Sequence, residues 1–411
     1  MLCDRRKLCR MLGGDSLVCV LVYLFVLIDY CGVIEGARQR RISQKELEAM
    51  NAEQLINYYG YNVESHRFVT YDGYVLTLHR LARPMARPVL LQHGVMGSTE
   101  TWVMQGPKRD LPYMMYEAGF DVWIGNVRGN LYGRNHVNMS VLDPKFWEFS
   151  WHEMGLYDLP GMLDYIIQWT GYPDVLYVGH SMGTTMAYVM GSMRPEYNRK
   201  IRVSIHMAPV AYMTLREFFY LYYVKFRTQF TRMYTRNGIY ELLPRNKYLR
   251  MIQADLCRDG SPFQWICIDM FFTLTGADWE QLNRTMVPMY LRHASPSSIQ
   301  TLDHFSQLIA RPGMFMAYDY KNIRKNYEKY GSYEPPTYNL SRVTAPAVLF
   351  YAKNDFLSRQ VDVDRISREL PNVVGKKLIQ YRKFNHIDYL WGKYSKKLVY
   401  DDIINLLRLY S

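Results

Sequence analysis

Apolar runs of strand length recur along this 411-residue chain, and each is bounded by glycine, proline or charged residues. Apolar runs between such turn residues predict strands. The predicted strands are residues 67–81, 87–94, 120–129, 175–181, 202–210, 345–355 and 377–386. The first run contains Tyr-Asp-Gly-Tyr at residues 71–74, and because Asp-Gly favours a tight turn, we expect an antiparallel hairpin there.

Segments of helix length lie between several of these strands, at residues 110–117, 157–170 and 184–193. Alternating strands and helices are typical of an α/β protein with a mostly parallel sheet. Between about residues 214 and 325 the alternation stops, and the sequence becomes helical and rich in aromatic residues. We therefore expect an α/β fold whose mostly parallel central sheet carries one helical insertion, a cap.

The N-terminus carries four basic residues and then an apolar run at residues 17–28. Because this run is shorter than the roughly 20 residues that span a bilayer, it predicts a cleaved signal peptide rather than an anchor. The expected division of the chain is a signal peptide at residues 1–36, a first part of the α/β core at 37–213, a cap and lid at 214–325 and a second part of the core at 326–411.

Three glycosylation sequons fit passage through the secretory pathway, and they begin at Asn138, Asn283 and Asn339. We therefore expect a secreted or lysosomal glycoprotein. Four of the six cysteines lie in or beside the predicted signal peptide, so Cys257 and Cys267 remain in the mature chain. Two cysteines in an oxidising compartment suggest one disulfide, and two buried free thiols are the alternative.

The formal net charge is +12. A basic surface can favour anionic membranes or lipid particles, although scattered solvated charge is the commoner explanation. The sequence contains no run of Lys and Arg, no zinc-ligand spacing and no aromatic RNA-binding motif. We therefore expect no nucleic-acid partner and no metal, and the sequence indicates no obligate protein partner.

Ser181 stands in the sequence Gly-His-Ser-Met-Gly, between a predicted strand and a predicted helix. This context is typical of a nucleophile elbow, a tight turn that exposes a serine hydroxyl. Glycines at 179 and 183 keep Cβ atoms out of the turn, and the following helix N-terminus favours developing negative charge. The motif therefore predicts a nucleophilic serine.

A serine hydroxyl needs a general base, and the base needs an orienting acid. In this fold the order along the chain is serine, acid, histidine. His386 ends the last predicted strand and is the best candidate base among ten histidines, and Asp355 at the end of the preceding strand is the candidate acid. Asp362 and Asp364 on the following predicted helix are the weaker candidates, whereas Asp388 lies too near His386 in sequence to turn back on it easily. Any of these carboxylates can also be an ordinary surface or helix-start residue.

An oxyanion intermediate needs two backbone N–H donors, one after the serine and one in the loop after an early strand. Met182 supplies the first position. The loop Leu-Leu-Gln-His-Gly-Val supplies the second, with Val95 as the expected donor and His93 as a buried brace for the loop. This chemistry needs no metal and no cofactor.

Dispersed motifs between about residues 58 and 407 resemble the acid lipase family of α/β-hydrolases, which includes gastric and lysosomal acid lipases. The matching stretches read VTYDGYVLTLHR, LQHGVMGSTETW, GFDVWIGNVRGN, FWEFSWHEMGLYDLPGMLDYI, GHSMGTT, YNLSRV and NHIDYLWG. The resemblance implies hydrolysis of neutral lipid esters by a triad of Ser181, Asp355 and His386. It also implies a helical cap with a mobile lid, and a disulfide between Cys257 and Cys267.

Two positions depart from the family pattern. Met182 stands where the family usually has glutamine, but a backbone donor survives that exchange. The loop AKNDFLSRQVDV around Asp355 lacks the usual Gly-Gly and Ala-Asp-Pro. These departures leave the substrate preference and the pH optimum open.

The sequence therefore predicts a serine lipase that cleaves triacylglycerol or cholesteryl ester through an acyl-enzyme, at a lipid–water interface. One alternative is an inactive lipid-binding or storage protein on a lipase fold, which the intact triad argues against. Another is a carboxylesterase for small esters, for which the long aromatic cap would be oversized.

Overall fold

The computed structural model describes residues 43–215, 218–243 and 255–411. The chain divides into two units, residues 1–49 and 50–411. In the first unit, helix α3 (Gln44–Ala49) begins after Ser43, whose Oγ accepts a hydrogen bond from the N–H of Glu46. The predicted signal peptide, residues 1–36, lies outside the described residues.

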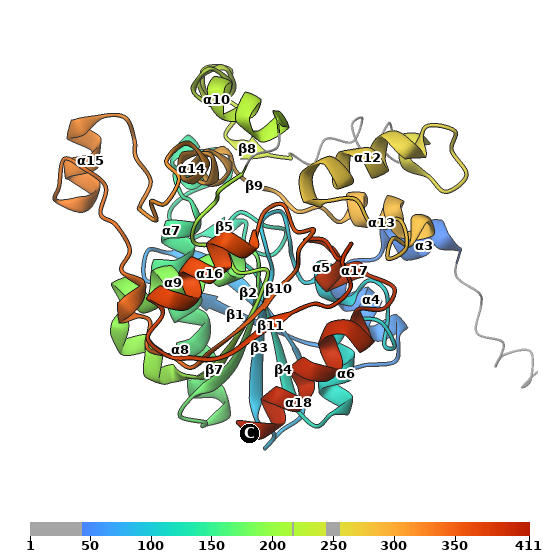
Figure 1. Cartoon of the computed structure of the whole chain (residues 1–411). Coiled ribbons are helices and arrows are strands. Elements are labelled where there is room, and N and C mark those ends of the chain that lie inside the picture. The colour runs from blue at the N-terminus through green and yellow to red at the C-terminus, as the bar shows by residue number, and fades with distance from the viewer. Residues whose placement is uncertain (1–42, 216–217, 244–254) are drawn as a thin grey trace, which may run out of the picture. The chain divides into compact units, whose positions relative to one another are not determined.

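The second unit is built on a nine-stranded sheet with the strand order β1-β2-β4-β3-β6-β7-β10-β11, and β5 pairs with β2 (Figure 1). Strand β2 is antiparallel to β1, β4 and β5, whereas the other neighbours are parallel. The predicted mostly parallel sheet is confirmed. The strands are β1 (Glu64–Val69), β2 (Tyr74–Leu81), β3 (Pro88–Gln92), β4 (Asp121–Gly125), β5 (Asn135–His136), β6 (Val175–His180), β7 (Ile201–Met207), β10 (Ala347–Tyr351) and β11 (Val373–Leu378).

The central parallel strands are apolar because both of their faces are covered. Every residue of β3, β4, β6 and β10 is buried. The hairpin predicted at residues 71–74 joins β1 to β2, with Val69 opposite Val75. Gly73 takes a positive φ of 93° in its turn, a conformation that suits glycine, so the hairpin prediction is confirmed.

Helices cover both faces of the sheet. In Figure 1, α8, α9 and α16 lie on one side of the strands, and α6 and α18 lie on the other. The helices outside the cap are α4 (Ala52–Tyr58), α5 (Glu100–Val103), α6 (Leu111–Glu117), α7 (Trp151–Glu153), α8 (Leu159–Thr170), α9 (Met182–Met193), α16 (Gln360–Glu369), α17 (Asp388–Trp391) and α18 (Asp401–Leu409). The three predicted core helices correspond to α6, α8 and α9, although α8 is preceded by a π-helical turn at Met154–Asp158.

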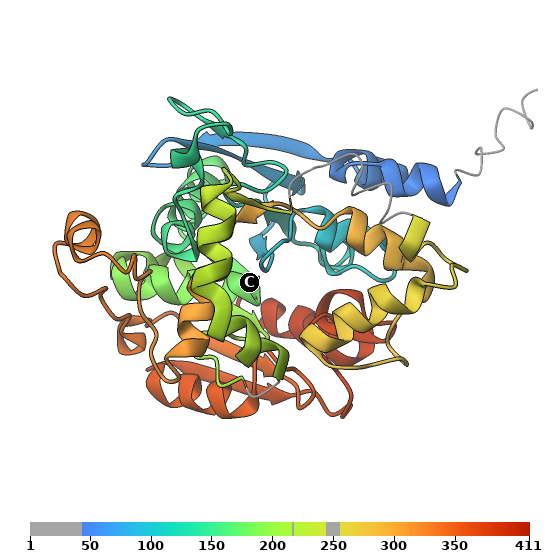
Figure 2. The same ribbon diagram turned by 90° about the horizontal axis from the view of Figure 1, so that it is seen from above.

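None of the described residues between β7 and β10 adds a strand to the main sheet. The helices there lie above the sheet in Figure 1, and Figure 2 shows α10, α12 and α13 in front of it when it is seen from above. The elements are α10 (Phe218–Arg236), α12 (Gln264–Thr275), α13 (Val287–Arg292), α14 (Ile299–Ala310), α15 (Ile323–Tyr330) and a two-stranded sheet of β8 (Glu241–Leu242) and β9 (Ser297–Ser298). We call residues 214–325 the cap, and its exact boundaries stay a prediction.

The last predicted strand, residues 377–386, was wrong in its extent. Strand β11 ends at Leu378, which pairs with Tyr351 at the end of β10. Because β11 is an edge strand and its only neighbour in the sheet ends there, the following residues have no partner for a ladder. The apolar residue Phe384 instead packs from a loop onto Tyr389, with ring centroids 4.8 Å apart. His386 therefore lies in a loop and does not end a strand.

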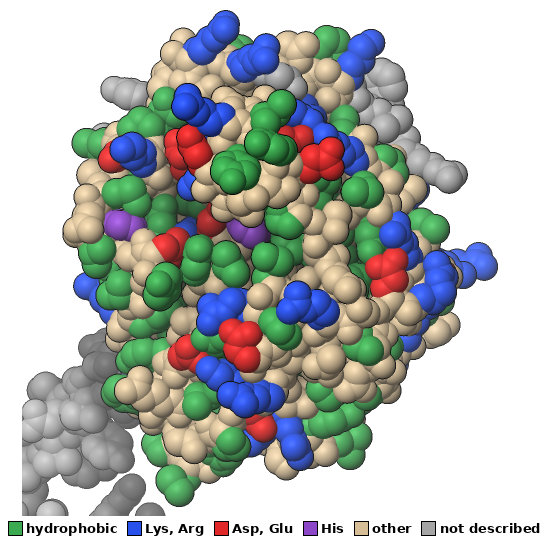
Figure 3. All heavy atoms as spheres, turned by 90° about the vertical axis from the view of Figure 1, so that its left-hand side faces the viewer, with side chains coloured by type: hydrophobic (Ala, Val, Ile, Leu, Met, Phe, Trp, Pro, Cys, Tyr) green, Lys and Arg blue, Asp and Glu red, His purple; other side chains and the backbone are tan. Residues whose placement is uncertain are grey.

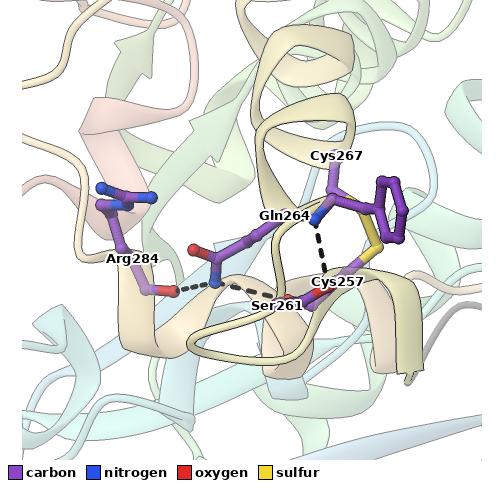
Figure 4. Close-up of a disulfide and its surroundings, with 6 residues drawn as sticks. Cys257, Ser261, Gln264, Cys267 and Arg284 are labelled. Atoms are coloured by element: carbon purple, nitrogen blue, oxygen red, sulfur yellow. Dashed lines mark hydrogen bonds between the residues drawn. A yellow bond between two sulfur atoms is a disulfide. The ribbon is translucent and has the colours of Figure 1, made fainter.

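A disulfide joins Cys257 and Cys267, whose Cα atoms are 5.8 Å apart. Figure 4 shows Gln264 beside this bridge, where its amide nitrogen donates to the carbonyl oxygens of Cys257 (3.3 Å) and Arg284 (3.0 Å). Both sulfurs belong to a small apolar cluster that includes Ile268. The bridge therefore ties the start of α12 to the segment that precedes it, as the sequence led us to expect.

Candidate active site

Ser181 occupies a strained turn between β6 and α9. Its φ of 52° and ψ of −118° are unusual for a residue with a side chain. The turn fits because Gly183 has no side chain, since a Cβ there would lie 2.6 Å from the carbonyl oxygen of Gln92. The local geometry is that of the predicted nucleophile elbow.

A continuous chain of hydrogen bonds connects the three residues that the sequence singled out. His386 Nε2 lies 2.8 Å from Ser181 Oγ, and His386 Nδ1 lies 2.9 Å from both carboxylate oxygens of Asp355. The N–H groups of Leu357 and Ser358 also donate to Asp355 Oδ1, at 2.9 and 2.8 Å. With Nδ1–H directed at the carboxylate, Nε2 is free to accept the serine proton. We call Ser181, His386 and Asp355 the triad.

The triad is assembled from three distant segments, the turns or loops that follow β6, β10 and β11. All three side chains are buried, and Ser181 is only 6% exposed. Charge that develops in such a water-poor site interacts more strongly with fixed donors than it would in bulk solvent.

The other candidate acids make different contacts. Asp362 accepts hydrogen bonds from the backbone and hydroxyl of Thr214, at 2.8 and 2.6 Å. Asp364 pairs with Lys376 at 2.5 Å on the surface. Asp388 accepts from the backbone N–H of Asn385 at 2.8 Å. Asp355 is the carboxylate that meets His386 Nδ1.

The two residues expected to donate to the oxyanion, Met182 and Val95, belong to the two segments that adjoin Ser181. Met182 is the first residue of α9, and the first N–H groups of a helix have no intrahelical acceptor. On the other side, a Cβ on Gly94 would lie 3.0 Å from Ser181 Cβ, so the loop after β3 touches the nucleophile. Val95 follows in a turn closed by the Gly97 N–H and the Gly94 carbonyl oxygen, 3.2 Å apart.

Comparison of the sequence with known proteins shows which family this chain belongs to. Residues 52–106 match the model of the partial alpha/beta-hydrolase lipase region, and residues 87–218 match that of the alpha/beta hydrolase fold. Lipase 1 of Drosophila melanogaster is 38% identical over 372 residues, which cover 90% of this chain and 82% of the relative. Gastric triacylglycerol lipase of Bos taurus is 32% identical over 381 residues, covering 89% and 93%.

The chain belongs to the lipase family of α/β-hydrolases that includes gastric lipase. The resemblance read from the sequence is thereby confirmed. Among solved structures, a putative lipase from Sulfolobus solfataricus has a TM-score of 0.53 at 14% identity, over 85% of this chain and 93% of that one. That similarity shows the fold alone.

His93 braces the loop after β3 of this lipase. Its Nδ1 lies 2.7 Å from the carbonyl oxygen of Gly94, and its Nε2 lies 3.2 Å from the amide nitrogen of Asn130. Burial lowers the pKa of His93 to about 4, so the ring is neutral at physiological pH, with Nδ1 as donor and Nε2 as acceptor. Its contacts are those of the brace expected from the sequence.

Two further contacts of the lipase hold the backbone of His386, and sequence reasoning missed both. His180 Nε2 donates to the carbonyl oxygen of His386 at 2.9 Å, and burial keeps the pKa of His180 well below its usual value. The N–H of His386 donates to the carbonyl oxygen of Thr275 in α12 at 3.3 Å. Because these contacts join positions far apart in the chain, their only sequence signal was the place of His180 beside Ser181.

The surface of the lipase carries mixed charge. On the face seen in Figure 3, Lys and Arg side chains lie among Asp and Glu side chains rather than in one stripe. In the part of the chain that the structure describes, no group of three or more His, Cys, Asp and Glu side chains is placed to hold a metal ion. No helix within the described ranges is long and apolar enough to cross a bilayer.

Proposed function

We propose that this chain is a serine lipase that hydrolyses neutral lipid esters, triacylglycerol or cholesteryl ester, through an acyl-enzyme. The observation that carries the proposal is the position of His386, with Nε2 2.8 Å from Ser181 Oγ and Nδ1 2.9 Å from both oxygens of Asp355. This geometry suits transfer of the serine proton to a correctly oriented imidazole.

In the proposed reaction, Ser181 Oγ attacks the ester carbonyl carbon while His386 Nε2 takes the hydroxyl proton. The carboxylate of Asp355 stabilises the imidazolium, and the N–H groups of Val95 and Met182 donate to the oxyanion. The tetrahedral intermediate expels the alcohol, which receives the proton from His386. Water then attacks the acyl-enzyme by the same route, and the fatty acid leaves with Ser181 restored.

The substrate class is inferred from the cap, because the buried serine is out of reach of a bulky lipid in this arrangement. The outer side of α12 and its surroundings expose large apolar side chains, namely Phe263, Trp265, Ile266, Met270 and Trp279. Exposed apolar surface of this kind marks contact with a membrane, lipid or protein. We propose that the cap opens when this surface meets a lipid–water interface.

Long acyl chains suit this arrangement, since each buried methylene adds roughly 0.8 kcal/mol of binding. The aromatic side chains of Phe218, Phe219, Tyr220, Tyr222 and Tyr223, which the sequence also suggested for acyl contacts, lie outside the described side chains. Both relatives named above are lipases by name, and the bovine one is a triacylglycerol lipase. A neutral lipid ester is therefore the proposed substrate.

The proposed route is the secretory pathway, toward secretion or the lysosome. Asn138 and Asn339 are exposed and Asn283 is partly exposed, so the three sequons are accessible to glycosylation. The disulfide between Cys257 and Cys267 also fits an oxidising compartment.

Labelling with a fluorophosphonate tests the proposal. The purified mature protein should react stoichiometrically at Ser181 and should hydrolyse emulsified long-chain esters in a substrate panel between about pH 4 and 9. Failure of Ser181 to react would favour the inactive lipid-binding protein. A preference for dissolved acetate or butyrate esters, with no gain at an interface, would favour the small-ester carboxylesterase.

A further inference from the structure

A short piece of the cap connects the two loops that carry the acid and the base of the triad. We call residues 275–278, at and after the end of α12, the bridging segment. On the histidine side, the carbonyl oxygen of Thr275 accepts from the N–H of His386 at 3.3 Å. The carbonyl oxygen of Gly276 accepts from the side-chain amide of Asn385 at 2.8 Å. The residue before the base is thus also held by the cap.

On the acid side, the bridging segment contacts Asn354, which directly precedes Asp355. The side-chain amide of Asn354 donates to the carbonyl oxygens of Ala277 at 3.0 Å and Lys383 at 2.6 Å. Gly276 has a positive φ of 101°, and a Cβ at this position would overlap the carbonyl oxygen of Asn354. The segment therefore fits tightly between the two loops.

Two buried carboxyl groups interact at the end of this segment, Asp278 from the cap and Asp388 from the start of α17. Asp278 Oδ1 accepts from the N–H groups of Glu280 (3.1 Å) and Gln281 (3.3 Å) and from the hydroxyl of Tyr381 (3.1 Å). Asp278 Oδ2 is buried and has no donor among these groups. The side chains of Asp278 and Asp388 interact with each other, so protonation of either carboxyl would give this pair of acceptors a donor.

The second carboxyl is in turn connected to the base. Asp388 accepts from the backbone N–H of Asn385 at 2.8 Å, and Asn385 Oδ1 accepts from the N–H groups of Ile387 (3.0 Å) and Asp388 (3.1 Å). His386 lies inside this turn. A displacement of Asp388 would therefore move the backbone that carries the imidazole.

We propose that Asp278 and Asp388 share one proton, and that this shared proton holds the bridging segment against the His386 loop. Both are then positioning residues for the hydrolysis, acting through the histidine without touching the substrate. The proposal rests on the proposed function of the triad, and it makes catalysis sensitive to pH through a pair outside the triad.

The direction of the pH effect follows from the ionisation of the pair. Burial raises the pKa of both carboxyls, and the charge of Asp278 further raises the pKa of Asp388. The folded state therefore keeps a proton that the unfolded state releases. The contact is fully made below the ordinary carboxyl pKa and is lost as pH rises through the raised pKa, where two carboxylates repel each other. Turnover should fall with it.

Other groups that face the pair do not produce this change. Burial raises the pKa of the phenols of Tyr290, Tyr381, Tyr389 and Tyr400 above their usual range, so they stay neutral. Hydrogen bonding to Lys383 lowers the pKa of Glu280, and Glu280 raises the pKa of Lys383, so both stay charged. Asp355 and His386 also lie near, but they are the same in every variant compared below.

The substitution Asp278→Asn tests the proposal, because the amide supplies a permanent donor in place of the shared proton. The ratio of kcat/KM at about pH 7.5 to that at about pH 5 should rise about threefold or more, because the variant keeps its contact at the pH where the wild-type pair loses its proton. The matched control is Glu280→Gln, a neighbouring carboxylate that also accepts from Tyr381 but is exposed. It should leave the ratio unchanged.

A second measurement does not depend on hydrolysis. The fall in thermal stability between pH 5 and pH 7.5 should be smaller in Asp278→Asn than in the wild type, while the buried Asp158, whose pKa is raised to about 6, contributes equally to both proteins. If Asp278→Asn does not fold, Asp388→Asn places the same donor on the other partner and carries the same expectations.

The outcomes separate the two proposals. An unchanged activity ratio together with an unchanged stability difference would overturn the shared proton, and so would an equal loss of activity at both pH values in a folded variant. If fluorophosphonate does not label Ser181 in the wild-type protein, the proposed hydrolysis is overturned instead. The stability measurement would still test whether Asp278 and Asp388 share a proton.

Discussion

Helices α9 and α12 have the same length and similar apolar sequences, yet their surroundings are opposite. Each has 12 residues, and neither separates its apolar residues onto one face. In α9 every residue from Met182 to Ser192 is buried. In α12 the buried residues are Gln264, Cys267, Ile268, Phe272 and Thr275, whereas Trp265, Ile266 and Met270 are exposed.

The difference shows that an apolar helix does not by itself indicate a core position. A helix that is apolar all round is stable when it is enclosed on all sides, as α9 is beneath the nucleophile turn. Helix α12 has only one side covered by the protein. Its other side leaves apolar surface in water, which is unfavourable unless another apolar phase covers it. In the proposed function, the first helix holds the reacting serine in place and the second offers its apolar surface to lipid.

The substitution Ser181→Ala should give the largest effect, and it lies directly before the buried helix α9. It removes one hydroxyl and creates no core cavity, so hydrolysis should fall by about a millionfold while the fold and adsorption to lipid emulsions are kept. Ester hydrolysis and a sedimentation assay with emulsion check the two halves. Appreciable turnover by the pure variant would contradict the assignment of the nucleophile.

Asp355→Asn should also reduce kcat strongly, by roughly ten-thousandfold, because an amide no longer favours the imidazole tautomer that accepts the serine proton. Asp364→Asn is the matched control, since that carboxylate pairs with Lys376 on the surface. The kinetic constants of both variants provide the measurement. If the control proved the more damaging change, Asp355 would not be the acid.

A matched pair of methionines tests the difference in burial directly. Met186 in α9 is completely buried, so Met186→Ala should reduce the free energy of unfolding by about 2 to 5 kcal/mol. Met270 in α12 is half exposed, and Met270→Ala should change it by less than about 0.5 kcal/mol. Urea unfolding curves of the two variants measure both values, and equal losses would mean that α12 is enclosed in solution.

Trp265→Ala should give the smallest effect, and it should reduce hydrolysis only when the substrate forms a lipid–water interface. Losing about 1 kcal/mol of binding to the lipid surface would lower hydrolysis of emulsified triacylglycerol by about fivefold and leave hydrolysis of a dissolved ester unchanged. Trp169 on α8 is 55% exposed, as Trp265 is, and therefore supplies the control variant Trp169→Ala. An equal effect of both substitutions on emulsions would remove α12 from the lipid-binding surface.

Much of the fold could be read from the sequence because its signals are local. Alternating strands and helices predicted the parallel sheet, and the glycines around Ser181 predicted the turn that the structure contains. The choice of Asp355 over Asp362 and Asp364 followed from the position of each along the chain. The structure brings Asp355, and not the others, to His386.

The strand predicted at residues 377–386 failed because local pattern does not show where a neighbouring strand ends. The apolar residues after Leu378 looked like the rest of a strand, but β10 offers no partner beyond Tyr351. His386 reaches Ser181 from a loop instead. The support of that loop by Thr275 has no local signal, and the support by His180 has only the place of His180 beside Ser181, because each contact joins distant positions in the chain.

By itself, the sequence determined the class of fold, the serine turn and the residue types of the triad, since each depends on neighbouring residues and on chain order. Only the tertiary structure decided which groups hold His386 in place and how much of α12 stays in contact with water. It also decided that Asp278 and Asp388, which are 110 positions apart in the chain, interact in one buried site. The reason is physical, because burial and the approach of two like charges depend on the packing of distant segments rather than on any local pattern.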